Sequence, residues 1–210
     1  MARGKLLVIM DTNSSHDYAP KGRIAVRHKT MVKLTLSALF GALTAAGTFI
    51  SIPIPLSPVP IVLQNLFALL TGLVLGPLGG LTGVGLYLLA GAVGVPVFAG
   101  ASGGFAHFLG PTGGFLLGYL FMAGVAGLIV GTPQADRPCP LWRIIAAALA
   151  GIILQYIPGV IQLKLVIDDT WLGAVTKGFL PFIIGDGIKG VVAVLIASRL
   201  RRLVADHLDG

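Results

Sequence analysis

The chain has 210 residues, of which 55% are hydrophobic and only 11% are charged, and its formal net charge is +7. No Asp, Glu, Lys or Arg occurs between Lys33 and Asp136, a run of 102 residues. A water-soluble fold needs polar cover on its outward faces. The composition therefore argues against a soluble enzyme, a disordered regulator and a nucleic-acid binder, and it predicts a polytopic membrane protein.

Residues 1–32 differ from the rest of the chain, because they are polar, basic and without apolar periodicity. The apolar stretch Leu6–Met10 is too short to be the core of a signal peptide. Met31 stands directly before the first apolar segment, so the preceding residues are interpreted as an extension or an artefact.

Six apolar segments approach the roughly 20 residues that a helix needs to cross the hydrocarbon core. Six crossings place both chain ends on one side, and basic residues gather before Thr30 and after Ser198. Positive residues favour the cytoplasmic side. We therefore expect an all-α membrane protein with a six-helix membrane domain over 33–200, cytoplasmic N and C termini, and a C-terminal tail over 201–210. The predicted spans are 34–52, 61–76, 79–95, 113–131, 142–163 and 178–198.

Two of the predicted outer loops are unusual. Prolines alternate through 53–60, which predicts an extended, stiff connection. The loop over 96–112 is apolar and rich in glycine, and irregular backbone near a membrane persists only when it is buried or lines a cavity. This second loop could therefore close over a ligand. Neutral polar side chains in the spans could bind a ligand or join helices: Gln64, Asn65, Tyr87, Gln155 and Gln162.

The clearest candidate for a site is the pair Asp186 and Lys189 in the last span. Residues three apart share one face of a helix and can pair. An ionisable residue inside a membrane is a functional hypothesis by default, although a neutralised pair that locks two helices is the simpler alternative. For a span that begins near Gly178, Asp186 lies about 12 Å from its outer end. Carboxylate and ammonium together suit a polar ligand such as a cyclic urea or an acid.

No catalytic constellation is recognisable in the sequence. His107 is isolated, with no carboxylate or cysteine at ligand spacing, so we expect neither a metal site nor a catalytic site there. A nucleophile elbow and a Walker motif are both missing, so nucleotide energy would have to enter through partner proteins.

Ala38, Ala42 and Ala46 recur every four residues and form a smooth stripe along the first predicted helix. Small residues let membrane helices approach closely. The stripe is interpreted first as internal packing and second as a docking face for another membrane protein.

Four motifs in order resemble the BioY biotin transporters, the substrate-binding S components of energy-coupling factor transporters. They are Pro-Ile-Pro-Leu-Ser-Pro-Val-Pro-Ile-Val-Leu-Gln64, Leu-Gly-Pro-Leu-Gly-Gly80, Tyr-Leu-Leu-Ala-Gly-Ala-Val-Gly-Val-Pro-Val-Phe98 and Leu-Gly-Pro-Thr-Gly-Gly114. The segment from Pro181 to Lys189 also resembles the last-helix motif of that family. The similarity extends over 33–200.

The resemblance implies a six-transmembrane-helix S-component bundle in a bacterial cytoplasmic membrane, with an outward-facing biotin pocket and no cofactor. Asp186 and Lys189 would be polar contacts, and Lys189 is the only basic side chain that the predicted topology buries. The alanine stripe would meet a transmembrane T component, while two cytoplasmic ATPases would drive uptake. An S component for another vitamin and a membrane-embedded lipid-modifying enzyme are the alternatives. The remaining implied substrate contacts are Tyr87, Gln64, Phe98, Gly103, Gly104, Thr112 and Gly113.

Overall fold

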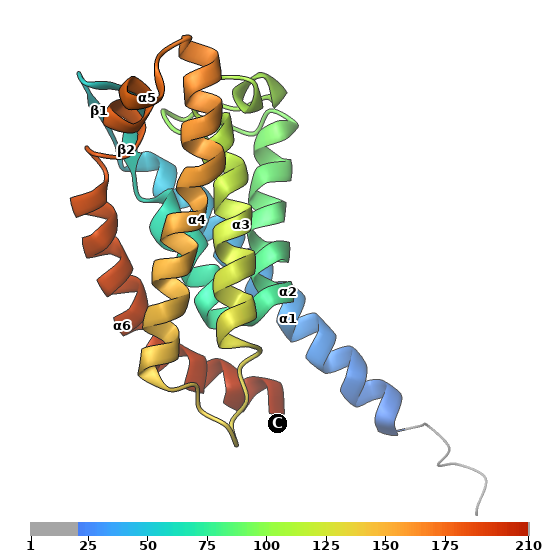
Figure 1. Cartoon of the computed structure of the whole chain (residues 1–210). Coiled ribbons are helices and arrows are strands. Elements are labelled where there is room, and N and C mark those ends of the chain that lie inside the picture. The colour runs from blue at the N-terminus through green and yellow to red at the C-terminus, as the bar shows by residue number, and fades with distance from the viewer. Residues whose placement is uncertain (1–20, 210) are drawn as a thin grey trace, which may run out of the picture.

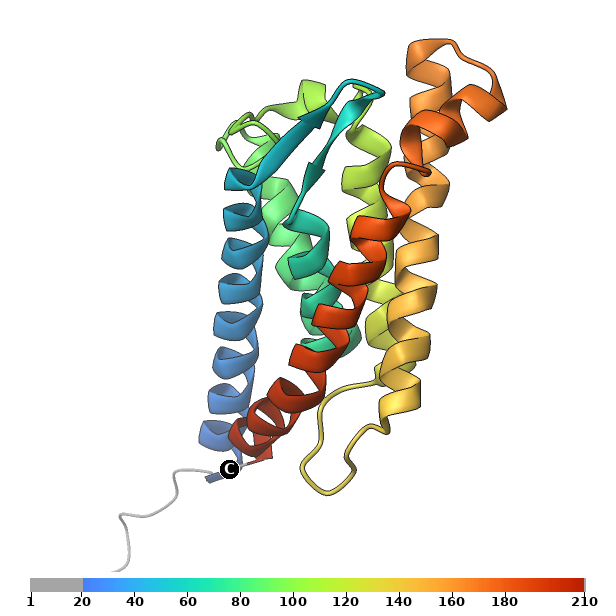
Figure 2. The ribbon, with the colours of Figure 1, turned by 90° about the vertical axis from the view of Figure 1, so that its left-hand side faces the viewer.

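In a computed structural model that describes residues 21–209, six α helices and one β hairpin form an upright bundle (Figure 1). The hairpin caps one end of the bundle, called here the hairpin end. Both described ends of the chain lie at the opposite end, called the terminal end (Figures 1 and 2). The elements are α1 (Lys21–Ala46), β1 (Ser51–Ile54), β2 (Ser57–Val62), α2 (Gln64–Ala92), α3 (Gly113–Val130), α4 (Leu141–Ile167), α5 (Trp171–Gly178) and α6 (Ile183–Asp209), with short 3₁₀ turns at Gly47–Phe49 and Phe105–Phe108.

The structure supports a multi-pass membrane protein with fewer uninterrupted spans than predicted. Within the described residues, four helical segments are long and apolar enough to cross a membrane, at Thr30–Phe49, Gln64–Ala92, Gly113–Val130 and Leu141–Ile167. A fifth span results if α5 and α6, which meet at a bend of 48°, are counted together. The second and third predicted spans, 61–76 and 79–95, are the two arms of α2.

The two arms of α2 meet at Gly76, whose backbone angles (φ 77°, ψ −169°) interrupt the helix. This combination is essentially reserved for glycine, because a Cβ would clash with the backbone. A Cβ built on Gly80 would lie 2.9 Å from Cα of Gly72. The two arms therefore lie side by side and run in opposite directions. The first arm, Gln64–Leu75, rises only about 18 Å, against about 30 Å for a hydrocarbon core. Its first residues therefore begin inside the bundle rather than at the surface.

The antiparallel hairpin β1–β2 descends from the hairpin end to the start of α2 and makes up this missing length (Figure 2). Its register pairs Ser51 with Val62 and Ile54 with Ser57. The predicted extended proline segment is thus confirmed. The first span ends slightly earlier than expected, because helix α1 stops at Ala46 and a 3₁₀ turn ends at Phe49, and the residues before Leu63 are strand rather than helix. Val59 and Val62 are buried and anchor the hairpin in the bundle.

Arg201 fastens the terminal end of the bundle. Its side chain is only 6% exposed, and its guanidinium donates hydrogen bonds to the carbonyl oxygens of Leu73 (2.6 Å), Val130 (3.1 Å) and Gly131 (3.1 Å). These bonds join α6 to the turn of α2 and to the end of α3. The expectation that Lys189 is the only buried basic side chain is therefore wrong, because backbone carbonyls at two helix ends supply acceptors for a second one.

The predicted tails are partly helical. Helix α6 continues to Asp209, so residues 201–209 of the predicted tail over 201–210 are helical, and residue 210 lies outside the described part of the chain. Helix α1 begins at Lys21, so 21–32 is helix too, while residues 1–20 of the predicted N-terminal tail lie outside the described part of the chain.

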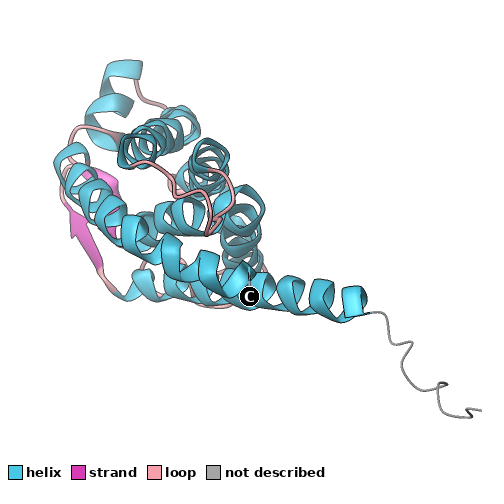
Figure 3. Ribbon diagram, turned by 90° about the horizontal axis from the view of Figure 1, so that it is seen from below, coloured by secondary structure: helices cyan, strands magenta, loops and turns pink. Residues whose placement is uncertain are grey.

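The alanine stripe of α1 faces outward. Ala38, Ala42 and Ala46 are all exposed, whereas the buried side of α1 brings Gly41 against Gly83 in the second arm of α2. Seen from below, α1 lies at the margin of the bundle and extends beyond it (Figure 3). The interpretation as internal packing is therefore wrong for this chain, because other residues of α1 make the internal contacts.

The turn of α2 generates the first prediction. Gly76→Ala should lower the free energy of unfolding by about 1–3 kcal/mol, because alanine avoids this backbone region and its Cβ would lie 2.9 Å from the Gly131 carbonyl oxygen. Gly85→Ala is the matched control, since nothing lies within 4 Å of its added Cβ. Thermal unfolding in detergent measures both variants, and equal midpoints would contradict the role given to Gly76.

Candidate functional site

Two adjoining hollows lie beneath the hairpin, between α2, α3, α4 and α6. Their volumes are about 240 Å³ and 30 Å³. The smaller one has room for about one water molecule, and it is where the polar groups of the site gather. Both hollows are lined by Val59, Pro60, Val62, Phe115 and Tyr119.

The carboxylate of Asp186 is the centre of the smaller hollow. Its Oδ1 accepts hydrogen bonds from Asn65 Nδ2 (2.8 Å) and Lys189 Nζ (2.9 Å), and its Oδ2 accepts from Gln155 Nε2 (3.0 Å) and the hydroxyl of Tyr156. The donors come from α2, α4 and α6. Three helices distant in sequence therefore converge on one carboxylate.

Lys189 completes the charge balance of this cluster. Its ammonium donates to Asp186, to Asn65 Oδ1 (3.0 Å) and to the carbonyl oxygen of Val62 at the end of β2 (2.7 Å). The side chains of Lys189 and Asp186 are only 12% and 6% exposed. Burying either charge alone would be costly, and the pair with its hydrogen bonds offsets that cost. The pairing predicted from the i, i+3 spacing is thus present, and it also anchors the hairpin.

Asp186 lies nearer the helix end than predicted. Because α6 begins at Ile183 and not near Gly178, the carboxylate is in the first turn of the helix. A negative charge is stabilised there by the free N–H groups and the dipole of the helix. The break between α5 and α6, at residues 179–182, moves the helix start to the level of the first arm of α2.

One acceptor in the cluster has no partner. The side-chain oxygen of Gln155 is buried without a hydrogen bond, although its nitrogen donates to Asp186. An unpaired buried acceptor costs about 1–3 kcal/mol. It is therefore a natural point of attachment for an N–H group of a ligand.

The larger hollow is mainly apolar and ends at the glycine-rich loop. Phe98 forms part of its wall and makes edge contacts with Tyr87 (5.7 Å between ring centres) and His107 (5.7 Å). Gln64 joins this loop to the 3₁₀ turn that follows α1, since its amide donates to the carbonyl oxygen of Val97 (2.7 Å) and to Thr48. The loop is a fixed wall of the hollow rather than a free connection.

The structure brings five of the predicted contact residues to the hollows, and the other four do not line them. The five lining residues are Asp186, Lys189, Gln64, Phe98 and Thr112. Tyr87 lies behind Phe98, and its buried hydroxyl has no partner. Gly103 and Gly113 allow close backbone contacts with Val95 and Phe108, and Gly104 has a positive φ of 108°.

Sequence reasoning missed two tyrosines at the site. Tyr156 donates to Asp186, and Tyr119 lines both hollows. Tyr156 follows Gln155 directly, and two adjacent polar groups within an apolar helix could have indicated the site. Gln162, whose role was open, donates to the carbonyl oxygens of Phe108 (2.6 Å) and Gly110 (2.9 Å) and so ties the loop to α4.

Metal ligands are not gathered at the site. Within the part of the chain that the structure describes, no three His, Cys, Asp or Glu side chains come together in an arrangement that could hold a metal ion. The site therefore consists of one buried ion pair, neutral amides and hydroxyls, and an apolar wall.

Comparisons with known proteins agree on one family. The model of the BioY family matches residues 19–206. The chain is 41% identical over 177 residues to a biotin transporter BioY of Thermotoga maritima, covering 84% of this chain and 100% of that protein. It is 40% identical to a probable biotin transporter BioY of Pyrococcus horikoshii, covering 80% and 96%. A crystal structure of the S component for biotin from an ECF-type ABC transporter is similar with a TM-score of 0.73 and 34% identity, covering 82% of this chain and 92% of that one.

The ion pair generates the second prediction, a double-mutant cycle. Asp186→Asn and Lys189→Met should each destabilise the fold by up to about 3–5 kcal/mol, because each leaves its former partner as a buried, unpaired charge. The double variant should be less destabilised than the sum of the two, since neither charge remains. Thermal unfolding in detergent measures the cycle, and strictly additive effects would show that the two groups do not stabilise one another.

Proposed function

The chain belongs to the BioY family, and we propose that it binds biotin from the outer side of the bacterial cytoplasmic membrane and mediates its uptake as the S component of an energy-coupling factor transporter. It is a transport protein rather than an enzyme, as its relatives are. The buried cluster around Asp186 is the main support for biotin as the ligand, because it presents both hydrogen-bond donors and acceptors within an apolar enclosure.

The polar cluster suits the cyclic urea of biotin, which has one carbonyl oxygen between two N–H groups. Asp186 and the unpaired oxygen of Gln155 are acceptors for the N–H groups, while Lys189 and Asn65 are donors for the carbonyl oxygen. Each of these side chains lines the smaller hollow. Hydrogen bonds to biotin would replace some of the hydrogen bonds within the cluster, while Asp186 and Lys189 would remain paired.

The larger hollow suits the sulfur-containing ring and the aliphatic tail. Phe98, Phe115 and Leu116 provide its apolar surface, and Thr112 and His107 add polar groups near the glycine-rich loop. Small-molecule sites commonly combine an apolar wall with a few fixed polar groups, in volumes of about 300–1,000 Å³. The observed 240 Å³ is slightly smaller, so we expect the hairpin and the loop to move apart for entry.

The four predicted contacts outside the hollows would act indirectly. Tyr87 supports Phe98 from behind, and Gly103, Gly104 and Gly113 set the path of the loop. These four residues would therefore determine the shape of the wall of the larger hollow, and they would make no hydrogen bond to the ligand.

Energy for transport would come from partners, in line with the family. The exposed alanine stripe of α1 is the proposed contact for a transmembrane T component, which would link the chain to two cytoplasmic ATPases. In this arrangement the terminal end of the bundle faces the cytoplasm and the hairpin end faces outward. The three arginines near the end of α6, at 199, 201 and 202, agree with that orientation.

Biotin titration of the purified chain tests the proposed ligand. Calorimetry without nucleotide should detect binding, and Asp186→Asn should weaken it about tenfold or more, because a hydrogen bond to a charged group contributes about 1.5–3 kcal/mol. Gln155→Met should also weaken it, through the loss of one acceptor. Asp169→Asn, the same substitution outside the hollows, should leave binding unchanged. Wild-type protein that binds another vitamin and not biotin would refute the assignment.

The docking face is tested by separating binding from transport. Ala42→Leu should abolish uptake in cells that also express the T component and the ATPases, because the bulkier side chain disturbs a close helix contact. Biotin binding by the purified variant should be retained, since Ala42 is exposed and remote from the hollows. Ala146→Leu is the control, an exposed alanine on α4. Loss of binding together with uptake would contradict the docking role.

A further inference from the structure

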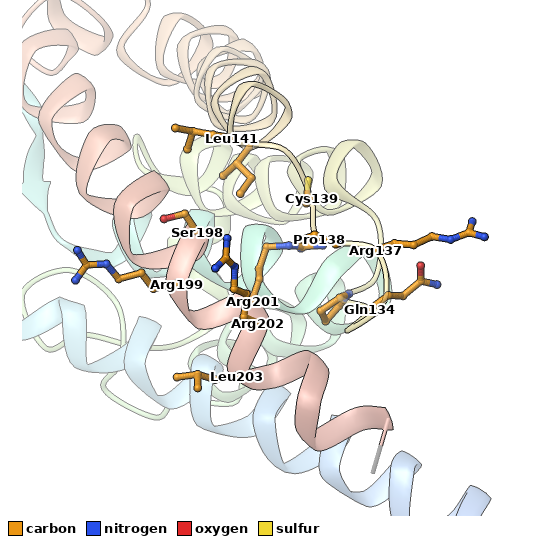
Figure 4. A pocket seen from close by; sticks show the side chains of 12 residues that line it. Gln134, Arg137, Pro138, Cys139, Leu141, Ser198, Arg199, Arg201, Arg202 and Leu203 are labelled. Carbon is orange, nitrogen blue, oxygen red and sulfur yellow. The ribbon is translucent and has the colours of Figure 1, made fainter.

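A separate cavity, of about 600 Å³, lies at the terminal end of the bundle, far from the two hollows under the hairpin. It lies between the α3–α4 connection, the start of α4 and the second half of α6 (Figure 4). Four arginines line it: Arg137, Arg199, Arg201 and Arg202. The proposed transport of biotin assigns no role to this cavity.

The positive charge of the cavity is not neutralised within the described chain. No Asp or Glu lines it, and none of the ion pairs found among the described side chains, those of residues 30–207, involves the three arginines of α6. Arg201 is buried, and its three hydrogen bonds go to backbone carbonyls, which carry no net charge. Arg137 meets Asp136 at 3.8 Å, but their side chains are 82% and 76% exposed, so this pair is weak.

Apolar side chains line the cavity as well, beside the polar Gln134 and Ser198. Leu141, Ile144 and Leu203 lie beside the arginines, and Leu141 and Leu203 are more than half exposed. Exposed leucines beside the arginines would contribute nothing to the binding of a free inorganic anion. A molecule with an anionic group and a hydrocarbon chain would cover both kinds of surface.

We propose that this cavity binds the phosphate of an anionic glycerophospholipid from the membrane leaflet at the terminal end. Arginine presents several N–H donors in a planar fork that matches the oxygens of a phosphate. Basic pockets between membrane helices on the cytoplasmic side favour such headgroups. Arg199 and Arg202 are exposed and free to turn toward the phosphate, whereas Arg201 supplies a fixed charge from below. The acyl chains would lie against Leu141 and Leu203.

Native mass spectrometry of the detergent-solubilised full chain tests this proposal. Phosphatidylglycerol and phosphatidylcholine with the same acyl chains are titrated separately, and the wild type should retain the anionic lipid about tenfold more strongly. Arg199→Gln combined with Arg202→Gln should reduce retention to the phosphatidylcholine level. Lys164→Gln combined with Lys177→Gln removes two charges at the hairpin end and should leave lipid retention unchanged.

Each other outcome overturns the proposal. Equal retention of the two lipids by the wild type would do so without any variant, and so would full retention by the arginine double variant. If inorganic phosphate displaces phosphatidylglycerol and raises the unfolding temperature as much as the lipid does, the site is one for a soluble anion. If the double variant keeps the lipid but no longer copurifies with the T component, the arginines form a protein contact.

Discussion

The carboxylate of Asp186 must be satisfied inside an apolar bundle, and much of the fold follows from this requirement. Four side chains donate to it, from α2, α4 and α6, and Lys189 extends the network to the last residue of β2. A buried charge is tolerated only where such donors converge. The cluster therefore sets how the first arm of α2 lies against α4 and α6, and it holds the hairpin over the same point.

The depth of the site results from a short helix arm. The first arm of α2 is too short to span a membrane, and β2 descends to meet it, so Asn65 lies below the hairpin and beside α6. Gly76 makes the arm short by reversing the chain, in a conformation that other residues avoid. The proline-rich hairpin is equally necessary, since its buried valines form the roof between the two hollows and the outside.

The two ends of the bundle use buried charge differently. At the hairpin end, a cation and an anion compensate one another and leave one amide oxygen unpaired, which suits a polar, uncharged ring. At the terminal end, Arg201 is held by carbonyls alone, so its charge remains available to an anion. Helix α1 contributes to neither site, and its alanine stripe is exposed on the outside of the bundle.

The sequence by itself determined the class of the protein, the approximate spans, the extended proline segment and the pair Asp186–Lys189, because composition, proline geometry and i, i+3 spacing are local properties. The order of the four glycine- and proline-rich motifs also indicated the family. Only the tertiary structure decided that Asn65, Gln155 and Tyr156 meet Asp186, that Arg201 is buried, and that the alanine stripe faces outward. The physical reason is that helix ends and helix rotations are set by packing between distant segments. The break before Ile183 and the reversal at Gly76 move whole faces relative to one another, and periodicity along a single helix does not record such shifts.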